Sequence, residues 1–400
     1  MYSKPVPSWK KTLIIGLFGF LATMMTVVGF SPLLPDIQQH FAMTYSQLGL
    51  FSGMTGIIAI IAGIPLGLFN RRFGLKKAIL TGMLFMAGGM TVVAVAPEFH
   101  VAIVGRIFWV VGIQMSYIAF IAMFNTIAPR SSNAKVMTIA YCANNFAAMI
   151  GAPVGSSLGE YFGWHISMFF YIVITLMFFL VILFFLRIET PDFEKKSDSE
   201  EQGAGIRRRS MIFKNPILIY LGILTCLIIF PPYQEYIPSV LEEVGYGTAF
   251  RGHIFMWAYA LGIPILIFSG ALADKFTPKK VLTITLIFFA AITPLLNTGS
   301  QAVVLFSSIF LLAFSSIPVS LAYTIPGLLF KKEDMGFVMG VIQAIGASGS
   351  YLGPQLSGIL RDYTGSFVWV WNCSALLNFI ACVMLLLICV RIRKRREKGI

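Results

Sequence analysis

Charged residues are scarce in this chain. Aspartate, glutamate, lysine and arginine make up 12% of its 400 residues, about half the share that is usual in soluble proteins. The four histidines form no His-x-x-x-His pair, and no phosphate-binding Gly-x-x-x-x-Gly-Lys-Ser/Thr segment occurs. Metal chemistry and ATP-driven work are therefore not indicated, and no Ser/His/Asp set points to hydrolysis. We expect a protein that is not an enzyme and that uses no cofactor and no metal.

Cysteine is also rare. The five cysteines have no close pairing pattern, and all of them fall inside long apolar runs: Cys142, Cys226, Cys373, Cys382 and Cys389. Their spacing predicts neither a disulfide framework nor a metal site.

Apolar residues, by contrast, make up 57% of the chain, and the mean hydropathy is +0.82. About 20 apolar residues cross the hydrocarbon layer as a helix, and the runs here lack the period-two alternation of membrane strands. The first run is too long for a signal peptide, so we expect an uncleaved helix there. Twelve runs are long enough to span, near residues 12–34, 46–69, 77–96, 101–125, 135–158, 165–187, 215–239, 250–273, 279–297, 301–326, 335–358 and 367–390.

Residues 35 to 80 reappear about 203 positions later. The matches include Pro35 with Pro238, Gly49 with Gly252, Gly67 with Gly270 and Lys77 with Lys280. Two related halves built of apolar segments are typical of secondary transporters. The sequence thus predicts an all-α membrane protein with twelve transmembrane helices in two pseudo-symmetric six-helix bundles. We place the bundles at 1–188 and 215–400, the second with a basic tail, and a cytoplasmic linker at 189–214.

The placement of charge predicts the orientation. If the N-terminus is cytoplasmic, all but three of the 30 lysines and arginines fall on the inner side. The exceptions are Arg106, Arg251 and Arg361, and the outer loops carry acids: Asp36, Glu98, Glu160, Glu235, Glu242, Glu243 and Asp362. This is the positive-inside pattern. It favours a multi-pass protein of the cell membrane with both termini cytoplasmic, and it indicates lipid rather than nucleic acid as the partner of the basic residues.

Two basic turns follow the second and the eighth run. The first contains Gly67, Arg71, Arg72, Gly74 and Lys76, and the second contains Gly270, Asp274 and Lys275. The glycines are expected to permit close helix contact, and a carboxylate beside a helix end can latch one state of a moving protein. Here the chain resembles the major facilitator superfamily, whose inner turn reads Gly-x-x-x-Asp-Arg-x-Gly-Arg-Arg. The first half departs from that pattern, because Arg71 stands where the family has the acid.

The resemblance implies two bundles around a central cavity that rock to give alternating access, driven by an ion gradient, most often protons. It also singles out Arg106 in the fourth run, where family members often have an arginine, followed here by Gly112. A charge inside a span is costly and is a functional candidate by default. We expect Arg106 to act in coupling or in anion attraction; the rival interpretation is an arginine that reaches to the outer interface.

Helix-packing and helix-breaking residues mark further positions. The fifth and eleventh runs carry a Gly-Pro pattern that the family shares: Gly151, Pro153, Gly155, Gly159, Gly353 and Pro354. Such glycines allow close helix approach. Proline pairs interrupt the first and seventh runs, which is a pointer to a transport path. Beside the second pair lies Glu235, our candidate for proton or substrate contact; an ordinary outer-loop carboxylate is the alternative.

Uncharged polar residues inside the runs are candidates for lining a cavity, although some will only bond neighbouring helices. They are Gln114, Tyr117, Asn125, Tyr141, Asn144, Asn145, Tyr236, Trp257, Tyr259, Tyr323 and Gln343. A cavity poor in charge suits a small organic solute. We therefore expect a secondary transporter, acting as a monomer with a small-molecule substrate and protons, and we slightly favour uptake of an organic acid. Export of hydrophobic compounds by a drug/proton antiporter is the alternative, and a non-transporting membrane sensor is a remote one.

Overall fold

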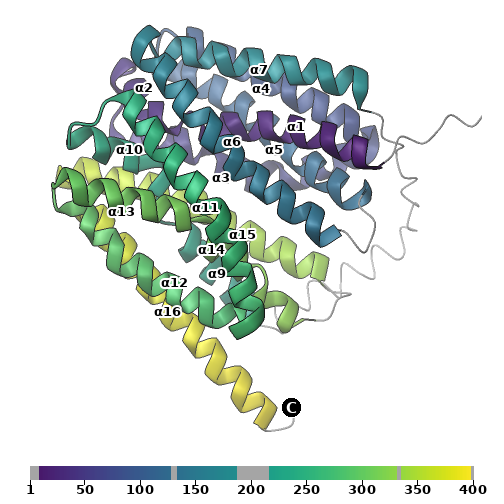
Figure 1. The fold of residues 1–400 in the computed structure, drawn as a ribbon, viewed down its shortest axis with the longest axis vertical. Coiled ribbons are helices and arrows are strands. Elements are labelled where there is room, and N and C mark those ends of the chain that lie inside the picture. The colour runs from purple at the N-terminus through teal and green to yellow at the C-terminus, as the bar shows by residue number, and fades with distance from the viewer. Residues whose placement is uncertain (1–8, 128–132, 187–215, 331–334, 398–400) are drawn as a thin grey trace, which may run out of the picture. The chain divides into compact units, whose positions relative to one another are not determined.

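The computed structural model describes residues 9–127, 133–186, 216–330 and 335–397, and every element in these ranges is helical (Figure 1). The side chains of Arg71, Tyr141 and Asp274 lie outside the description. So does the whole of the predicted linker at 189–214.

The first half contains seven α-helices and one short 3₁₀ helix in its described residues. They are α1 (Trp9–Val28), η1 (Ser31–Leu33), α2 (Leu34–His40), α3 (Tyr45–Phe73), α4 (Leu75–Val95), α5 (Phe99–Ile127), α6 (Asn133–Phe162) and α7 (Trp164–Phe185).

The described part of the second half follows the same plan with more breaks. Its elements are α9 (Pro216–Ile229), α10 (Tyr233–Glu243), α11 (Thr248–Phe276), α12 (Pro278–Ile292), η2 (Thr293–Asn297), α13 (Gln301–Phe314), α14 (Ser316–Ala322), η3 (Ile325–Leu328), α15 (Met335–Thr364) and α16 (Val368–Glu397).

The prediction of twelve spans is confirmed. Ten of the predicted spans coincide with helices, or helix pairs, that are long and apolar enough to cross a membrane within the described residues. The other two correspond to α6 and α15, which are each 30 residues long. These two helices carry the Gly-Pro pattern and many small or polar residues, and this composition lowers their hydropathy.

The predicted interruptions also occur. The first span consists of α1, η1 and α2, and the seventh consists of α9 and α10. Each break lies at proline, Pro32 in the first span and Pro231–Pro232 in the seventh. Proline has no amide hydrogen to donate and cannot continue the helical hydrogen-bond ladder.

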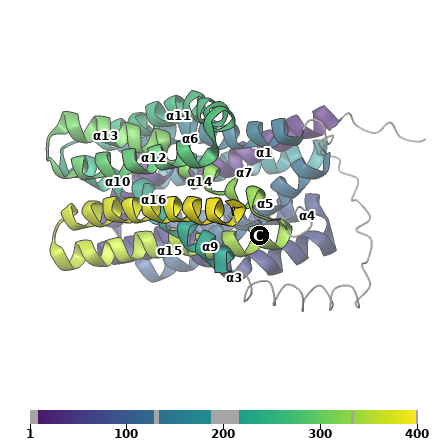
Figure 2. The same ribbon diagram turned by 90° about the horizontal axis from the view of Figure 1, so that it is seen from below.

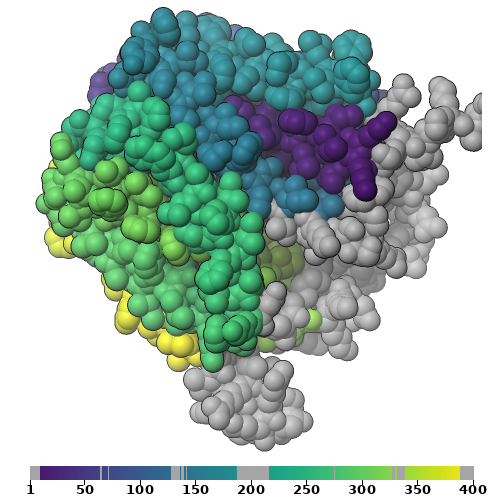
Figure 3. Space-filling view, viewed as in Figure 1, coloured from purple at the N-terminus to yellow at the C-terminus, as the bar shows by residue number. Residues whose placement is uncertain are grey.

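Two compact units divide the chain. The first comprises Met1–Met43, Ile58–Phe193 and Gly245–Ala260. In its core, the ring of Phe20 meets those of Phe120 and Phe124 edge to face. Helix α1 contacts α6 and α7 in this unit, and its purple surface borders the blue surface of later segments in the space-filling view (Figure 3).

The second unit comprises Thr44–Ile57, Glu194–Val244 and Leu261–Ile400. Its apolar core includes Leu221, Leu286, Ile342 and Leu385, all 2% exposed or less. Helices α12 and α16 run side by side in both ribbon views (Figures 1 and 2). The proposed division at 1–188 and 215–400 stays a prediction.

Each unit includes a helix segment from the other half of the sequence. The division falls between residues 57 and 58 within α3, and between residues 260 and 261 within α11. The internal repeat relates these two boundaries, because they lie about 203 positions apart, which is the offset of the repeat in the sequence. Helices α3 and α11 are therefore the elements that link the two sequence halves.

Candidate functional site

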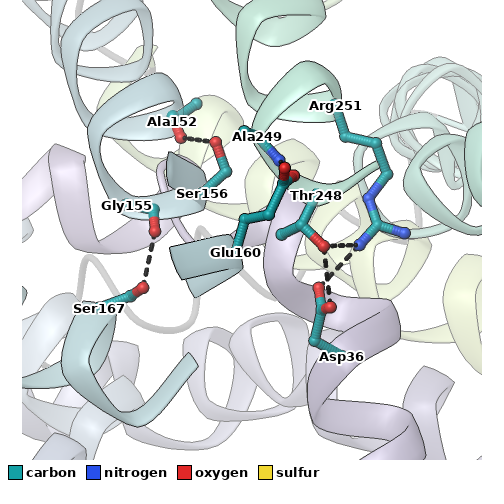
Figure 4. Close-up of polar contacts among 9 residues, drawn as sticks. All are labelled: Asp36, Ala152, Gly155, Ser156, Glu160, Ser167, Thr248, Ala249 and Arg251. Atoms are coloured by element: carbon teal, nitrogen blue, oxygen red, sulfur yellow. Dashed lines mark hydrogen bonds and ion pairs between the residues drawn. The ribbon is translucent and has the colours of Figure 1, made fainter. Parts of the chain in front are cut away.

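The start of α11 is held by acidic residues from the first half of the chain (Figure 4). The backbone amide of Ala249 donates to the Glu160 carboxylate near the end of α6 at 2.5 Å. The Thr248 hydroxyl donates to Asp36 of α2 at 2.9 Å. A carboxylate at a helix N-terminus satisfies amides that have no partner within the helix and meets the positive end of the helix dipole. We call the contacts of α11 with α2 and α6 junction one.

Junction one also contains a buried ion pair. The Arg251 guanidinium donates to Asp36 at 2.7 Å and to the Thr248 hydroxyl at 2.7 Å, as Figure 4 shows. Arg251 is 1% exposed and the Asp36 side chain is 31% exposed. A guanidinium that has lost its water needs a charged, hydrogen-bonded partner, so α2 and α11 are tied to each other by strong electrostatics.

A close helix crossing completes junction one. A Cβ atom added to Gly252 would stand 2.7 Å from the carbonyl oxygen of Ala152 in α6, and would also clash with Ser156. The Ser156 hydroxyl in turn bonds Ala152 within its own helix at 2.7 Å. Only glycine fits where the two backbones approach this closely.

The start of α3 is held in a corresponding way by the end of α15. The two oxygens of the Asp362 carboxylate accept hydrogen bonds from the backbone amides of Tyr45 and Ser46, each at 2.8 Å. A Cβ added to Gly49 would clash with the carbonyl of Pro354. We call the contacts of α3 with α10 and α15 junction two.

Junction two has its own polar ties. The Tyr236 hydroxyl lies 2.8 Å from the carbonyl oxygen of Tyr45 and 2.9 Å from that of Pro354. Arg361 donates to Glu243 at 2.8 Å, with side-chain exposures of 16% and 43%. The same guanidinium lies over the Tyr45 ring at 4.8 Å, so one arginine contacts both α3 and α10.

The two junctions are related by the internal repeat. Gly49 and Gly252 are 203 positions apart, and Glu160 and Asp362 occupy matching places near the ends of α6 and α15. Each junction joins one helix of one sequence half to helices of the other half. Sequence reasoning assigned these acids only to outer loops; the offset between α6 and α15 is the signal that relates Glu160 to Asp362.

Arg106 is 2% exposed and lies against aromatic rings. Its guanidinium carbon is 4.7 Å from the centre of the Phe30 ring and 4.3 Å from that of Trp109. Cation–π contacts of this kind strengthen when water is excluded. Arg106 therefore holds the break after α1 against α5 in this conformation, and its role in transport remains a proposal.

Glu235 lies in the first turn of α10 and is half-buried. The adjacent Tyr236 is fully buried in junction two. A carboxylate in this position is close in sequence to the contact between α10 and α3, and its role in coupling also remains a proposal.

The polar cavity candidates divide by burial. Asn145, Tyr236 and Tyr259 are 2% exposed or less, whereas Trp257 is 42% exposed. Asn125 is exposed and donates to the Ile121 carbonyl of its own helix. Gln114, Tyr117, Asn144 and Tyr323 are half-buried and Gln343 is exposed, while the Tyr141 side chain is outside the description. Their contact with solute stays a prediction.

The glycines of the basic turns have open space around them among the described residues. A Cβ added to Gly67 or Gly270 meets no described atom within 4 Å, and the close helix contact expected at these glycines stays a prediction. Their helices make their close crossings at the opposite ends, at Gly49 and Gly252.

The neighbouring basic residues have local contacts. Lys76 donates to the Leu183 carbonyl near the end of α7 at 2.9 Å. Arg72 and Lys275 lie over the rings of the phenylalanines that follow them, at 5.4 and 5.6 Å. Gly74 begins α4 with φ of 87°, a conformation that favours glycine. The side chains of Arg71 and Asp274, on which the latch prediction rests, lie outside the described residues.

The glycines of the Gly-Pro helices do permit close approach. Added Cβ atoms at Gly151, Gly155 and Gly159 would contact Met25, Tyr171 and Leu33 respectively, and one at Gly353 would clash with Phe230. The Tyr171 hydroxyl also donates to the Gly151 carbonyl at 3.0 Å. The packing role predicted for these positions of α6 and α15, including Pro153 and Pro354 beside them, agrees with these contacts.

Comparison with known proteins identifies the family. The model of the Major Facilitator Superfamily matches residues 16–263 and 252–400. The chain belongs to this superfamily. It is a multi-pass membrane transporter and not an enzyme.

Solved structures with the same fold have low sequence identity to this chain. A bacterial homologue of the human lysosomal transporter Spinster, in an inward-facing and unoccupied conformation, is 14% identical with a TM-score of 0.76, over 96% of this chain and 97% of that one. A D-xylose–proton symporter is 14% identical with a TM-score of 0.77, over 94% and 97%. The nucleoside transporter NupG is 11% identical with a TM-score of 0.81, over 94% and 99%.

Proposed function

We propose that this protein is a secondary active transporter that moves a small organic solute across the cell membrane by alternating access, driven by protons. The observation that carries the proposal is the pair of repeat-related junctions. Helices α3 and α11 each cross helices of the other sequence half at their first turns, whereas an added Cβ at Gly67 or Gly270 meets no described atom within 4 Å. By the predicted topology, both junctions lie at the outer face.

Junctions of this kind suit a reversible gate. They combine close glycine crossings with carboxylates at helix ends, and both can separate without unfolding any helix. Breaking them would let the outer ends part, while new contacts at the basic turns would close the inner side. The exchange between two such arrangements is the bistable element that alternating access requires.

The favoured cargo is a small organic acid or a related metabolite taken up with protons. The sparse charge within the predicted spans supports a neutral or singly charged solute. The likeness in fold to a D-xylose–proton symporter and to a nucleoside transporter supports transport of such solutes. Arg106 would meet a carboxylate in a conformation that moves Phe30 away from its guanidinium.

Two acids are proposed for proton coupling. Glu235 is half-buried beside the interruption of the seventh span. Asp36, which sequence reasoning treated as a loop acid, pairs with the buried Arg251. Loss of this pair would favour opening of junction one.

The test begins with a ligand. Detergent-purified protein is screened against metabolites and drugs by thermal shift, because a ligand that binds the folded state raises its melting temperature. The ligand is then followed in proteoliposomes with an imposed proton gradient. Gradient-driven accumulation is the expected result. Extrusion of hydrophobic compounds would favour the drug/proton antiporter, and absence of any gradient-driven flux with a confirmed ligand would contradict transport.

Variants separate the residue roles. Arg106→Ala is expected to abolish accumulation at normal protein levels, and Glu235→Gln to preserve solute exchange while removing its dependence on the proton gradient. Near-native accumulation in the first variant would exclude Arg106 from the mechanism. Unchanged proton dependence in the second would leave Glu235 as an ordinary loop residue.

A further inference from the structure

An apolar groove opens on the surface of the second unit. It has a volume of about 440 Å³ and lies between α11, α12 and the region where α13 gives way to α14. Phe268 and Ile284 on its rim are 64% and 68% exposed. Side chains this apolar and this exposed on a membrane-spanning helix face lipid rather than water.

The two hydroxyl groups that line the groove do not donate to a polar ligand, because each already donates within its own helix. Ser269 donates to the Leu266 carbonyl and Thr285 donates to the Val281 carbonyl, each at 2.8 Å within its own helix. With these donors engaged, burial of apolar surface is the main favourable contribution that the groove can make.

The groove is about as long as one leaflet of the hydrocarbon core is thick. Its lining residues on α11 run from Ile265 to Phe276, which is roughly 16 Å at the rise of an α-helix. The hydrocarbon core of a bilayer is about 30 Å thick, so the groove extends over about one leaflet. Since α11 is a membrane span, the groove runs across the bilayer in the direction of an acyl chain.

A cation stands at one end of this apolar strip. Lys280, at the start of α12, is exposed and lines the groove together with Phe276 at the end of α11. A lysine can cover apolar surface with its methylene groups while its ammonium reaches the headgroup region. Among the described residues that line the groove, Lys280 is the one cation and none is a carboxylate, which is complementary to an acyl chain with an anionic headgroup.

The groove is not a simple product of the repeat. Lys77 is the repeat partner of Lys280, but Leu66 and Phe69 stand where the second half has Ser269 and Leu272. Both of these larger side chains pack against the core of the first unit. The second half has therefore kept the cation and has smaller side chains at these two positions.

We propose that this groove binds an anionic phospholipid, with one acyl chain along α11 and α12 and the phosphate at Lys280. Basic pockets between membrane helices are a known class of site for anionic headgroups. Lipid bound here would contact α11, the helix that also forms junction one. The proposal stands independently of the identity of the transported solute.

Photocrosslinking tests the site directly. Purified full-length protein is reconstituted into vesicles that contain either phosphatidylglycerol or phosphatidylcholine with a photoreactive group in the acyl chain, and labelled peptides are mapped by mass spectrometry. We expect peptides covering 265–285 to be labelled about fivefold more by phosphatidylglycerol, the ratio for one lysine near an anionic headgroup. Equal labelling by the two lipids would overturn the proposal.

Two variants separate headgroup from chain. Lys280→Gln should remove the preference for phosphatidylglycerol, whereas the matched control Lys77→Gln should retain it. Ile284→Trp, at an exposed rim position that tolerates a larger side chain, should fill the groove and reduce labelling by both lipids. Equal effects of the two lysine variants, or unchanged labelling in Ile284→Trp, would show that lipid meets this surface without a specific site.

Discussion

Junction one and junction two have the same backbone design and different polar chemistry. In both, a carboxylate from the end of a Gly-Pro helix meets the first amides of α3 or α11, and a glycine four residues after the helix start allows a close crossing. Junction one adds the buried pair of Arg251 and Asp36. Junction two adds the Tyr236 hydroxyl and a partly exposed ion pair.

The helix starts differ as well. At the start of α3, the backbone amide of Gln47 donates to the Thr44 hydroxyl, and the backbone amide of Thr44 donates to the side-chain oxygen of Gln47. This reciprocal pair is a capping box. The matching positions of α11 are Gly247 and Phe250, which have no side-chain acceptor. The start of α11 therefore depends more on Glu160 from another helix. The repeat supplies the architecture, and the divergent side chains make the start of α11 more dependent than the start of α3 on contacts with other helices.

The largest effect is expected at the buried ion pair. Asp36→Ala removes the carboxylate that faces a desolvated guanidinium, and breaking such a pair costs about 3–5 kcal/mol. We expect a large fall in the melting temperature or a shift to the open junction. The double variant Asp36→Ala/Arg251→Met should recover much of that loss, because it removes the buried charge as well. Additive losses in the cycle would contradict direct coupling between these residues.

The next effect is steric, and variants at both ends of α3 and α11 test it. Gly252→Val and Gly49→Val insert atoms into close crossings, at a cost of about 1–3 kcal/mol for overpacking. Since 1–3 kcal/mol corresponds to about 5- to 150-fold in an equilibrium constant, each variant should shift the open population by a factor in this range. Gly270→Val and Gly67→Val are the matched controls. Equal effects at all four positions would indicate general helix damage.

Some features of the fold and of the two junctions can be predicted from the sequence, and others cannot. The twelve spans, the interrupted first and seventh spans and the relation of Gly49 to Gly252 follow from hydropathy, proline and the repeat. The pairing of Asp36 with Arg251 does not, because no local pattern selects a partner 215 positions away. The close packing predicted at Gly67 stays a prediction, because a turn motif alone does not show which conformation makes the contact.

A smaller effect is expected at the helix caps. Loss of a capping acceptor costs about 0.5–2 kcal/mol. Glu160→Ala should fall near the upper end, because α11 has Gly247 at its start, and Asp362→Ala near the lower end, because Thr44 and Gln47 still cap α3. Backbone hydrogen exchange in the first turns of both helices measures the difference. Faster exchange in α3 of Asp362→Ala than in α11 of Glu160→Ala would reverse the comparison.

The smallest effect is expected at the pair of Arg361 and Glu243. Its acid is 43% exposed, and exposed pairs contribute about 0–1 kcal/mol. Glu243→Gln should change the melting temperature little, and high salt should reduce that small change further. A loss as large as that of Asp36→Ala would show that exposure does not separate the two pairs.

The most direct test follows the separation of α6 and α11 at junction one. Spin labels at the exposed positions Tyr161 and Phe250, in a background without native cysteines, report their distance in reconstituted protein. The account predicts two distances, short and long, with Gly252→Val and Asp36→Ala increasing the long one and Gly270→Val leaving the distribution unchanged. A single short distance in the wild-type background and in all three variants would contradict a gate at this junction.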